Sequence, residues 1–240
     1  MNIRNSPVVL PIMNSIILSC EHASNAVPSF VANLFADQKE KLATHCGYDI
    51  GAAPVFEKLC TLLPVLYAAK GNCTRLAIDL NRSGNHPARF SRATKNISQA
   101  LYGKLEKIWI DFRNSIEKEI RTFLKRNSKQ TILHLSIHTF TPVLEGKERL
   151  AEIGLLYDPG CPQERALAKA WKENLHAKVP GNRIRLNYPY QGKSDGHTTS
   201  LRKKFGSRYL GIEVEMNQAW LATQTPTQVA RLLAETLPTH

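Results

Sequence analysis

Short apolar runs rich in β-branched residues alternate with longer amphipathic segments along most of the chain. These runs predict strands, because each is short and is bounded by polar or turn-forming residues. They occupy residues 16–20, 65–69, 76–80, 132–137, 153–157, 183–186 and 209–214. Helical segments between the strands favour a mostly parallel or mixed sheet, because parallel neighbours need a crossover connection.

The helical segments are marked by apolar residues that recur every three or four positions. The clearest covers residues 98–126, where one face carries Leu105, Ile116 and Ile120 and the opposite face is charged. Further helices are predicted at residues 51–62, 162–177 and 227–237. No repeat or long linker interrupts the pattern. We therefore predict one three-layer α/β/α domain over residues 1–240, with a mixed, mostly parallel sheet.

A chain of 240 residues with 42% hydrophobic and 22% charged residues is typical of a globular protein, which excludes a mostly disordered or coiled-coil chain. No apolar run is long enough to span a membrane, because Pro11 and Asn14 interrupt the N-terminal stretch. With Pro7 also inside it, that stretch does not match a secretory signal. The five cysteines have no C-x-x-C spacing, so we expect reduced thiols and a cytoplasmic protein.

The net charge of +12 suits nucleic acid, an anionic membrane surface or a small anionic substrate. The basic residues are dispersed, and the densest cluster, at residues 202–208, carries none of the known nucleic-acid-binding motifs. The charge pattern therefore does not favour nucleic acid, and it is compatible with a small anionic substrate.

Polar clusters stand beside the predicted strands, at residues 19–25, 45–49, 75–82, 134–138 and 213–218. In an α/β sheet, functional sites form from loops at the carboxyl ends of the strands. His134 and His138 are four residues apart on one strand, so their side chains share a face. We therefore expect the clusters to contribute to one shared site.

The residue types in these clusters suit metal-assisted hydrolysis. Such a site needs two or three His or carboxylate ligands, an open position for water, and a carboxylate that accepts the proton of that water. His22, Asp49 and His138 would supply the ligands, and Glu215 would be the base.

A substrate carboxylate would find binding partners in the same clusters. The planar guanidinium groups of Arg75 and Arg82 suit bidentate pairing with a carboxylate, and Asn81 would add a donor.

Several residues of these clusters also have an ordinary structural explanation. His134 fits a core histidine with satisfied hydrogen bonds better than a ligand, whereas His138 fits either role. Asp49 would suit a helix N-terminus, Glu21 a capping contact, and Glu215 a solvent-facing strand position. No H-E-x-x-H, G-x-S-x-G, P-loop or G-x-G-x-x-G motif is present, so the usual motifs of other hydrolases, NTPases and dehydrogenases are missing.

Characteristic blocks follow one another at residues 17–28, 45–52, 78–82, 136–142, 187–192 and 211–218. Together they resemble the N-formylglutamate amidohydrolase family over about residues 16–220. The resemblance implies an α/β fold akin to the zinc carboxypeptidases and aspartoacylases. It also implies that a metal-activated water hydrolyses the amide C–N bond of a small anionic N-acylamino acid.

The resemblance also implies a ligand set. His22 and His138 match histidines of the family at strand ends, and Asp49 matches an acidic residue after the first helix. We expect zinc, although such ligands also accept Mn, Co or Fe. The wider carboxypeptidase-like pattern has Glu three residues after the first histidine, where this chain has Asn25. The second protein ligand therefore stays open between Asp49 and Glu21.

For the substrate, the resemblance implies a general base and several binding residues. Glu215 resembles the base of the wider fold. The candidate substrate-binding residues are Arg75, Asn81, Arg82, Tyr190 and His197. Among them, His197 is a candidate donor to the oxyanion of the tetrahedral state.

The sequence around the first histidine, at residues 21–24, differs from that of the deformylase branch of the family, so the substrate need not be N-formylglutamate. A related metallo-carboxypeptidase or N-acylamino acid deacylase would use the same site on another leaving group. A non-catalytic anion-binding or nucleic-acid-binding protein would account for the charge, but it would leave the clustered polar residues unexplained.

Overall fold

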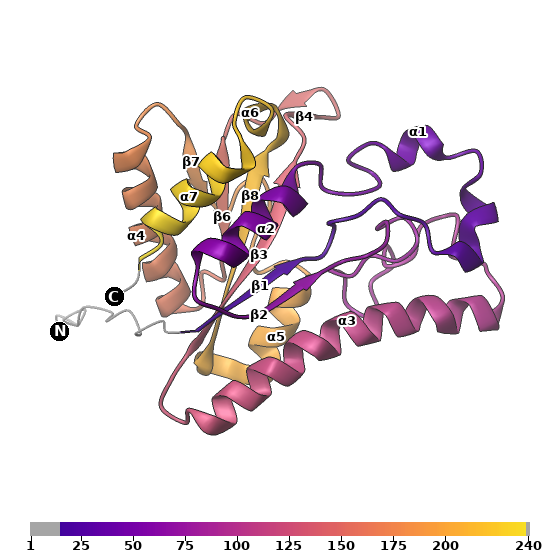
Figure 1. The fold of residues 1–240 in the computed structure, drawn as a ribbon, viewed down its shortest axis with the longest axis horizontal. Helices are drawn as coiled ribbons and strands as arrows, with labels where there is room; N and C mark the ends of the chain where they lie inside the picture. The colour runs from indigo at the N-terminus through magenta and orange to yellow at the C-terminus, as the bar shows by residue number, and fades with distance from the viewer. Residues whose placement is uncertain (1–14, 239–240) are drawn as a thin grey trace.

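The computed structural model describes residues 15–238 of the chain. Its core is a six-stranded sheet with the strand order β2-β1-β3-β8-β6-β7 (Figure 1). The strands are β1 (Ile16–Cys20), β2 (Val65–Lys70), β3 (Ile132–Phe140), β6 (Ile153–Leu156), β7 (Ile184–Leu186) and β8 (Tyr209–Asn217). Neighbouring strands are parallel except β6 and β8, which are antiparallel. The predicted mixed, mostly parallel sheet is confirmed.

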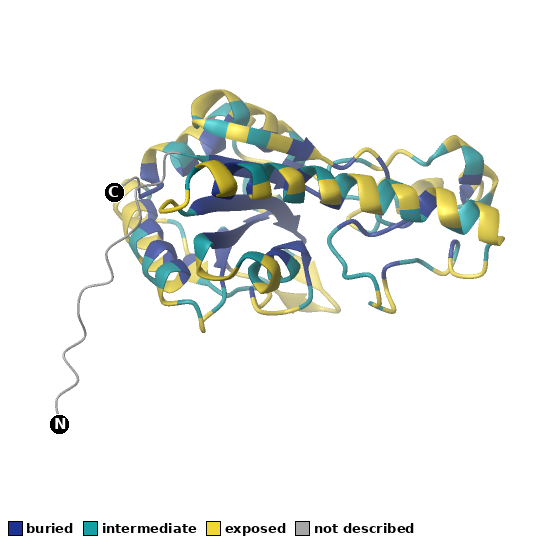
Figure 2. Ribbon diagram, turned by 90° about the horizontal axis from the view of Figure 1, so that it is seen from below, coloured by how far each residue is buried: buried dark blue, intermediate teal, exposed yellow. Residues whose placement is uncertain are grey.

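Helices cover both faces of this sheet, which confirms the three predicted layers (Figures 1 and 2). On one face, α2 (Ala52–Leu62), α4 (Pro162–Lys178) and α7 (Pro226–Thr236) pack over the largest apolar core. On the other face, α3 (Gln99–Arg126) and α5 (His197–Phe205) pack over a smaller one. The observed bounds of α2, α3, α4 and α7 lie within one residue of the bounds predicted from apolar periodicity.

On the face covered by α3 and α5, the strands change from apolar to polar toward their carboxyl ends. Along β3, Ile132 is followed on the same face by Ser136 and His138, and all three are buried. Along β8, buried Tyr209 is followed in the same way by Glu215. The apolar core therefore gives way to buried polar groups at the carboxyl edge of the sheet, as functional sites in α/β sheets require.

The predicted strand at residues 76–80 is wrong, because this run forms buried turns outside the sheet. It packs against the N-terminal half of α3 in a third apolar core. Its backbone groups are satisfied locally: the amide of Ala77 donates to the carbonyl of Thr74, and Thr94 Oγ1 donates to the carbonyl of Ala77. A short apolar run predicts burial, and here burial is achieved without sheet pairing.

Two further differences concern segment lengths. No helix was predicted between residues 187 and 206, but this segment contains α5, whose Thr198 and Leu201 are buried. The strands β3 and β8 also continue beyond their predicted ends, to Phe140 and Asn217. His138 and Glu215 consequently lie on regular strand backbone rather than in loops.

The remaining elements are short, and they include a hairpin after β3, a helical turn before β8 and another after it. They are η1 (Ser29–Phe35), α1 (Lys39–Leu42), β4 (Val143–Leu144), β5 (Lys147–Glu148), η2 (Gly206–Arg208) and α6 (Gln218–Leu221). The hairpin of β4 and β5 turns through Glu145 and Gly146, both with positive φ, as a tight two-residue turn requires. Within residues 15–238, no helix combines the length and apolarity needed to cross a membrane. Pro7 and Pro11 lie outside the described residues.

Candidate active site

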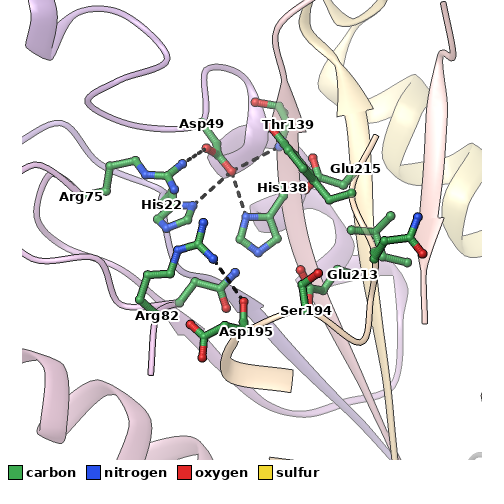
Figure 3. A pocket seen from close by; sticks show the side chains of 14 residues that line it. His22, Asp49, Arg75, Arg82, His138, Thr139, Ser194, Asp195, Glu213 and Glu215 are labelled. Atoms are coloured by element: carbon green, nitrogen blue, oxygen red, sulfur yellow. Dashed lines mark hydrogen bonds and ion pairs between the residues drawn. The ribbon is translucent and has the colours of Figure 1, made fainter. Parts of the chain in front are cut away.

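A cavity of about 430 Å³ opens where the buried strand face becomes polar (Figure 3). Its lining includes most of the sequence-predicted site residues: His22, Asp49, Arg75, Asn81, Arg82, His138, Tyr190 and Glu215. The lining does not include His197 or Glu21, the alternative to Asp49 as a ligand. The lining residues come from segments far apart in the chain, so the fold brings the predicted clusters together at one place.

Two histidines and an aspartate form the most closely spaced group in the cavity. His22 follows β1, Asp49 precedes α2, and His138 lies near the end of β3. The distance to Oδ2 of Asp49 is 2.9 Å from Nδ1 of His138 and 3.4 Å from Nδ1 of His22. One ligand atom of each residue lies within 4.8 Å of the others, and all three side chains are buried.

Outer contacts hold this group in position. Nε2 of His22 lies 2.8 Å from Oδ1 of Asp79. Arg75 donates to Oδ2 of Asp79 at 2.9 Å and to Oδ1 of Asp49 at 3.4 Å. Burial alone would raise the pKa of Asp49, but the positive charge of His22 and the hydrogen bond from His138 hold that pKa well below its usual range. Asp49 is therefore anionic at neutral pH, as a carboxylate ligand must be.

The His22–Asp49–His138 group fits a divalent metal ion. Nδ1 of His22 is buried without a hydrogen-bond partner, which is uncommon for a polar atom in a protein interior. The other ring nitrogen of each histidine is bonded, in His22 to Asp79 and in His138 to Ser136. Partners of this kind orient imidazole rings in metal sites and leave the second nitrogen free to bind the ion.

Glu215 lies beside this group, opposite His138 in the pairing of β3 with β8. Its side chain is buried, and Oε2 has no hydrogen-bond partner. Burial raises the pKa of Glu215 to about 7, although the positive charge of His138 opposes the shift. A carboxyl group with a pKa near neutrality can both accept and release a proton under working conditions.

The raised pKa of Glu215 predicts a pH-dependent cost to the stability of the metal-free protein. An unfolded glutamate ionises near pH 4.5, so between pH 4.5 and 7 the folded state holds a proton that the unfolded state has lost. The free energy of unfolding should therefore fall across this window, by about 3 kcal/mol from this group. In urea unfolding with a chelator present, Glu215→Gln should match the wild type near pH 4 and exceed its stability at pH 8. An equal difference at both pH values would contradict the expectation.

Arg82 lies across the cavity from Glu215 (Figure 3). Asn81, the preceding residue, also lines the cavity, so the two side chains offer donors that a carboxylate could bind. Arg82 donates to the backbone oxygen of Asp195 at 3.3 Å. Oδ1 of Asn81 accepts from the backbone amide of His197 at 2.7 Å, which fixes the orientation of the side chain. Tyr190, 45% exposed, lies at the rim. Arg75 differs from Arg82 because its guanidinium group is already bound to two carboxylates.

His134 and His197 lie behind the cavity rather than on its wall. His134 is fully buried and bonds to Tyr209 and Ser19, which confirms its interpretation as a core histidine with satisfied hydrogen bonds. His197 is 1% exposed, and its Nδ1 lies 3.2 Å from Glu21. This position does not support the predicted contact between His197 and the substrate.

Sequence reasoning missed two residues that bind the histidines of the site: Asp79, which contacts His22, and Ser136, which contacts His138. Both carried a positional signal: Asp79 lies inside a predicted polar cluster, and Ser136 shares a strand face with His138. Their partners could not be identified, because the bond between His22 and Asp79 joins residues 57 positions apart.

Solved structures of other proteins share this fold. One is the crystal structure of a gene product from Agrobacterium tumefaciens, whose sequence is 24% identical to this chain. The TM-score is 0.76, and the match covers 92% of this chain and 88% of that protein. Another is the N-formylglutamate amidohydrolase from Ralstonia eutropha JMP134, whose sequence is 14% identical to this chain. The TM-score is 0.60, and the match covers 96% of this chain and 93% of that protein. At these identities the comparison shows the fold. No curated protein matches the chain.

The polar cavity at the carboxyl edge of a largely parallel sheet is the arrangement of an α/β enzyme. Residues 14–222 match the family model for N-formylglutamate amidohydrolase. The chain therefore belongs to the N-formylglutamate amidohydrolase family, and it is a hydrolase that acts on an amide C–N bond.

Proposed function

We propose that this protein is a metal-dependent amidohydrolase that removes a formyl or other acyl group from an N-acylated amino acid such as N-formylglutamate. The observation that carries the proposal is the buried His22–Asp49–His138 group, with one unpartnered imidazole nitrogen, next to Glu215. Family membership supports the bond class, and Arg82, which lines the cavity without a carboxylate partner among the described residues, supports a substrate that carries a carboxylate.

Nδ1 of His22, a carboxylate oxygen of Asp49 and Nδ1 of His138 would hold the metal, and zinc suits such ligands. When bound, zinc activates a water molecule and polarises the amide carbonyl group. Asp79 and Ser136 would keep the two imidazole rings in orientation by binding their Nε2 atoms.

Glu215 would carry the proton between the two halves of the reaction. Its ionised carboxylate accepts a proton as the water oxygen attacks the carbonyl carbon. The protonated carboxyl group then donates that proton to the amide nitrogen, the C–N bond breaks, and a carboxylic acid and an amine are released. A pKa of about 7 suits a group that performs both steps.

Arg82 would bind the substrate carboxylate, with Asn81 as a second donor. The substitution Arg82→Ala removes a charge-assisted hydrogen bond to the substrate, which would contribute about 1.5–3 kcal/mol to binding. We expect KM to rise by about 10- to 100-fold and kcat to change much less, because this contact is made in both the ground state and the transition state. Steady-state kinetics would measure the split, with Arg82→Lys as the variant that keeps the charge. A fall in kcat at unchanged KM would contradict this role.

The experiment that tests the proposed function is a panel of N-formyl and longer N-acyl amino acids, assayed for released amine with and without a chelator. Turnover of N-formyl substrates that stops on chelation and returns with zinc would support the proposal. Turnover of longer N-acyl substrates alone would favour a deacylase, and cleavage of peptides would favour a carboxypeptidase. Full activity of the metal-free protein would contradict the metal dependence.

The alternative of a nucleic-acid-binding protein draws little support from the basic cluster at residues 202–208. Arg202 donates to buried Glu164 and to the carbonyl of Gly211. Arg208 donates to the carbonyls of Ser128 and Leu124. These guanidinium groups are used to hold α5 and the start of β8 in place, so the hydrolase remains the better account of the molecule.

A further inference from the structure

Glu21, the residue before His22, is buried and lies outside the His22–Asp49–His138 group. Its carboxylate accepts hydrogen bonds from Ser19 Oγ at 2.8 Å and from Ser136 Oγ at 2.7 Å, and His197 Nδ1 lies 3.2 Å away. Each oxygen of the Glu21 carboxylate thus accepts a hydrogen bond from a different serine hydroxyl, Oε1 from Ser19 and Oε2 from Ser136. An ionised carboxylate accepts hydrogen bonds and cannot donate them.

This restriction settles the direction of the bond between Ser136 and His138. A serine hydroxyl has one hydrogen, and Ser136 donates it to Glu21. Toward Nε2 of His138, 2.8 Å away, Ser136 can therefore act only as an acceptor. Nε2 of His138 therefore carries a proton. The other ring nitrogen, Nδ1, faces Oδ2 of Asp49 at 2.9 Å and is the nitrogen at which a metal would take the place of a proton.

The same argument applies to a second chain of contacts from Glu21. Ser19 donates its hydrogen to Glu21, so it accepts from Nε2 of His134 at 2.8 Å. Burial lowers the pKa of His134 to about 3, so this histidine is neutral. Its Nδ1 must accept from the hydroxyl of Tyr209, 2.7 Å away.

We propose that Glu21 is a positioning residue that acts through Ser136 to present Nδ1 of His138 to the metal, and through Ser19 to hold His134 in the matching Nε2–H tautomer. The proposal rests on the proposed metal site and deepens it, because it assigns Glu21 to the support of a ligand and leaves Asp49 as the carboxylate ligand. One buried anion thus determines the proton positions on two strands of the sheet.

The two serines provide a matched pair of variants. Ser136→Ala removes the hydroxyl group that connects Glu21 to His138. Ser19→Ala removes the hydroxyl group that connects Glu21 to His134. Zinc affinity would be measured by competition with a chromogenic chelator, and histidine tautomers by ¹⁵N NMR. We expect Ser136→Ala to weaken zinc binding by about 10- to 100-fold, as for the loss of other partners of ligand histidines. Ser19→Ala should bind zinc as the wild type does but lose the Nε2–H tautomer of His134.

Glu21→Gln tests the carboxylate itself. The amide keeps the size but replaces one acceptor oxygen with a donor, so one of the two serines can no longer donate to it. Zinc affinity should fall as in Ser136→Ala without being abolished. Loss of zinc as complete as in His138→Ala, together with normal binding by Ser136→Ala, would show that Glu21 is itself a ligand and would overturn the proposal.

A measurement on the metal-free wild type separates this inference from the proposed function. His134 is not a candidate ligand, so its tautomer reports on the chain of contacts whether or not zinc binds. An Nδ1–H tautomer of His134 would overturn the proposal. The Nε2–H tautomer in a protein that binds no zinc would support this arrangement of protons while contradicting the proposed metal site. If Glu21→Gln does not fold, the serine pair still decides the outcome.

Discussion

Glu215→Gln is expected to lower kcat by about 10²- to 10⁴-fold while bound zinc is retained, because proton transfer by a positioned carboxyl group contributes rate enhancements of this size. Glutamine occupies nearly the same volume and can neither accept the proton of the attacking water nor donate one to the leaving amine. KM should change little, because Glu215 is not expected to bind the ground state more tightly than glutamine would. The measurement is steady-state kinetics on a substrate confirmed in the acyl-amino-acid panel, with zinc content determined on the same samples.

Glu213 provides the matched control for this variant. It lies two residues earlier on β8, also lines the cavity and accepts a hydrogen bond from Thr198. We expect Glu213→Gln to lower kcat far less than Glu215→Gln does. The pH profile gives a second test: the acidic limb of kcat/KM should disappear in Glu215→Gln and persist in Glu213→Gln. Bound zinc would move that limb below pH 7, because a nearby cation favours the ionised carboxylate. Near-normal turnover by Glu215→Gln would contradict the assignment.

The parts of the fold that the sequence predicts well are those with a strong local signal. α3 has a long apolar stripe, and its start is fixed by the N-cap residue Ser98, whose side chain accepts from the amide of Leu101. β1 is observed over the residues that the apolar run marks. The run at 76–80 has the same apolar character but is buried beside α3, because burial alone does not specify a hydrogen-bonding neighbour.

For the site, residue type and proximity to a strand end were sufficient to find the members of the cavity, but not their partners. His22 and His138 were identifiable because each lies at the end of a strand, and Asp49 because it stands just before a helix. The binding of Arg75 to Asp49 and Asp79 was not predictable, because side-chain geometry decides whether an arginine faces the substrate or a neighbouring carboxylate. The position of His197 depends on α5, which periodicity did not reveal.

His22→Ala and His138→Ala are each expected to reduce bound metal from about one equivalent to a small fraction of that value. Each variant removes one of three protein ligands, and the two that remain cannot surround the ion. Elemental analysis after dialysis against trace zinc would measure the loss. His176→Ala, which removes an exposed histidine on α4, should retain the wild-type content and controls for nonspecific binding.

Thermal unfolding distinguishes loss of the ligand from loss of the fold. A metal that binds the folded state alone stabilises it by RT ln(1 + [M]/Kd), so zinc should raise the Tm of the wild type and of His176→Ala. The Tm of His22→Ala and of His138→Ala should not respond to zinc, although both should unfold cooperatively without it. Removal of either buried imidazole also takes a partner from the buried carboxylate of Asp49, and His22→Ala takes one from Asp79 as well, so some loss of stability in the metal-free state is expected. Wild-type protein that takes up no zinc, or histidine variants that still respond to it, would contradict a metal site at this group.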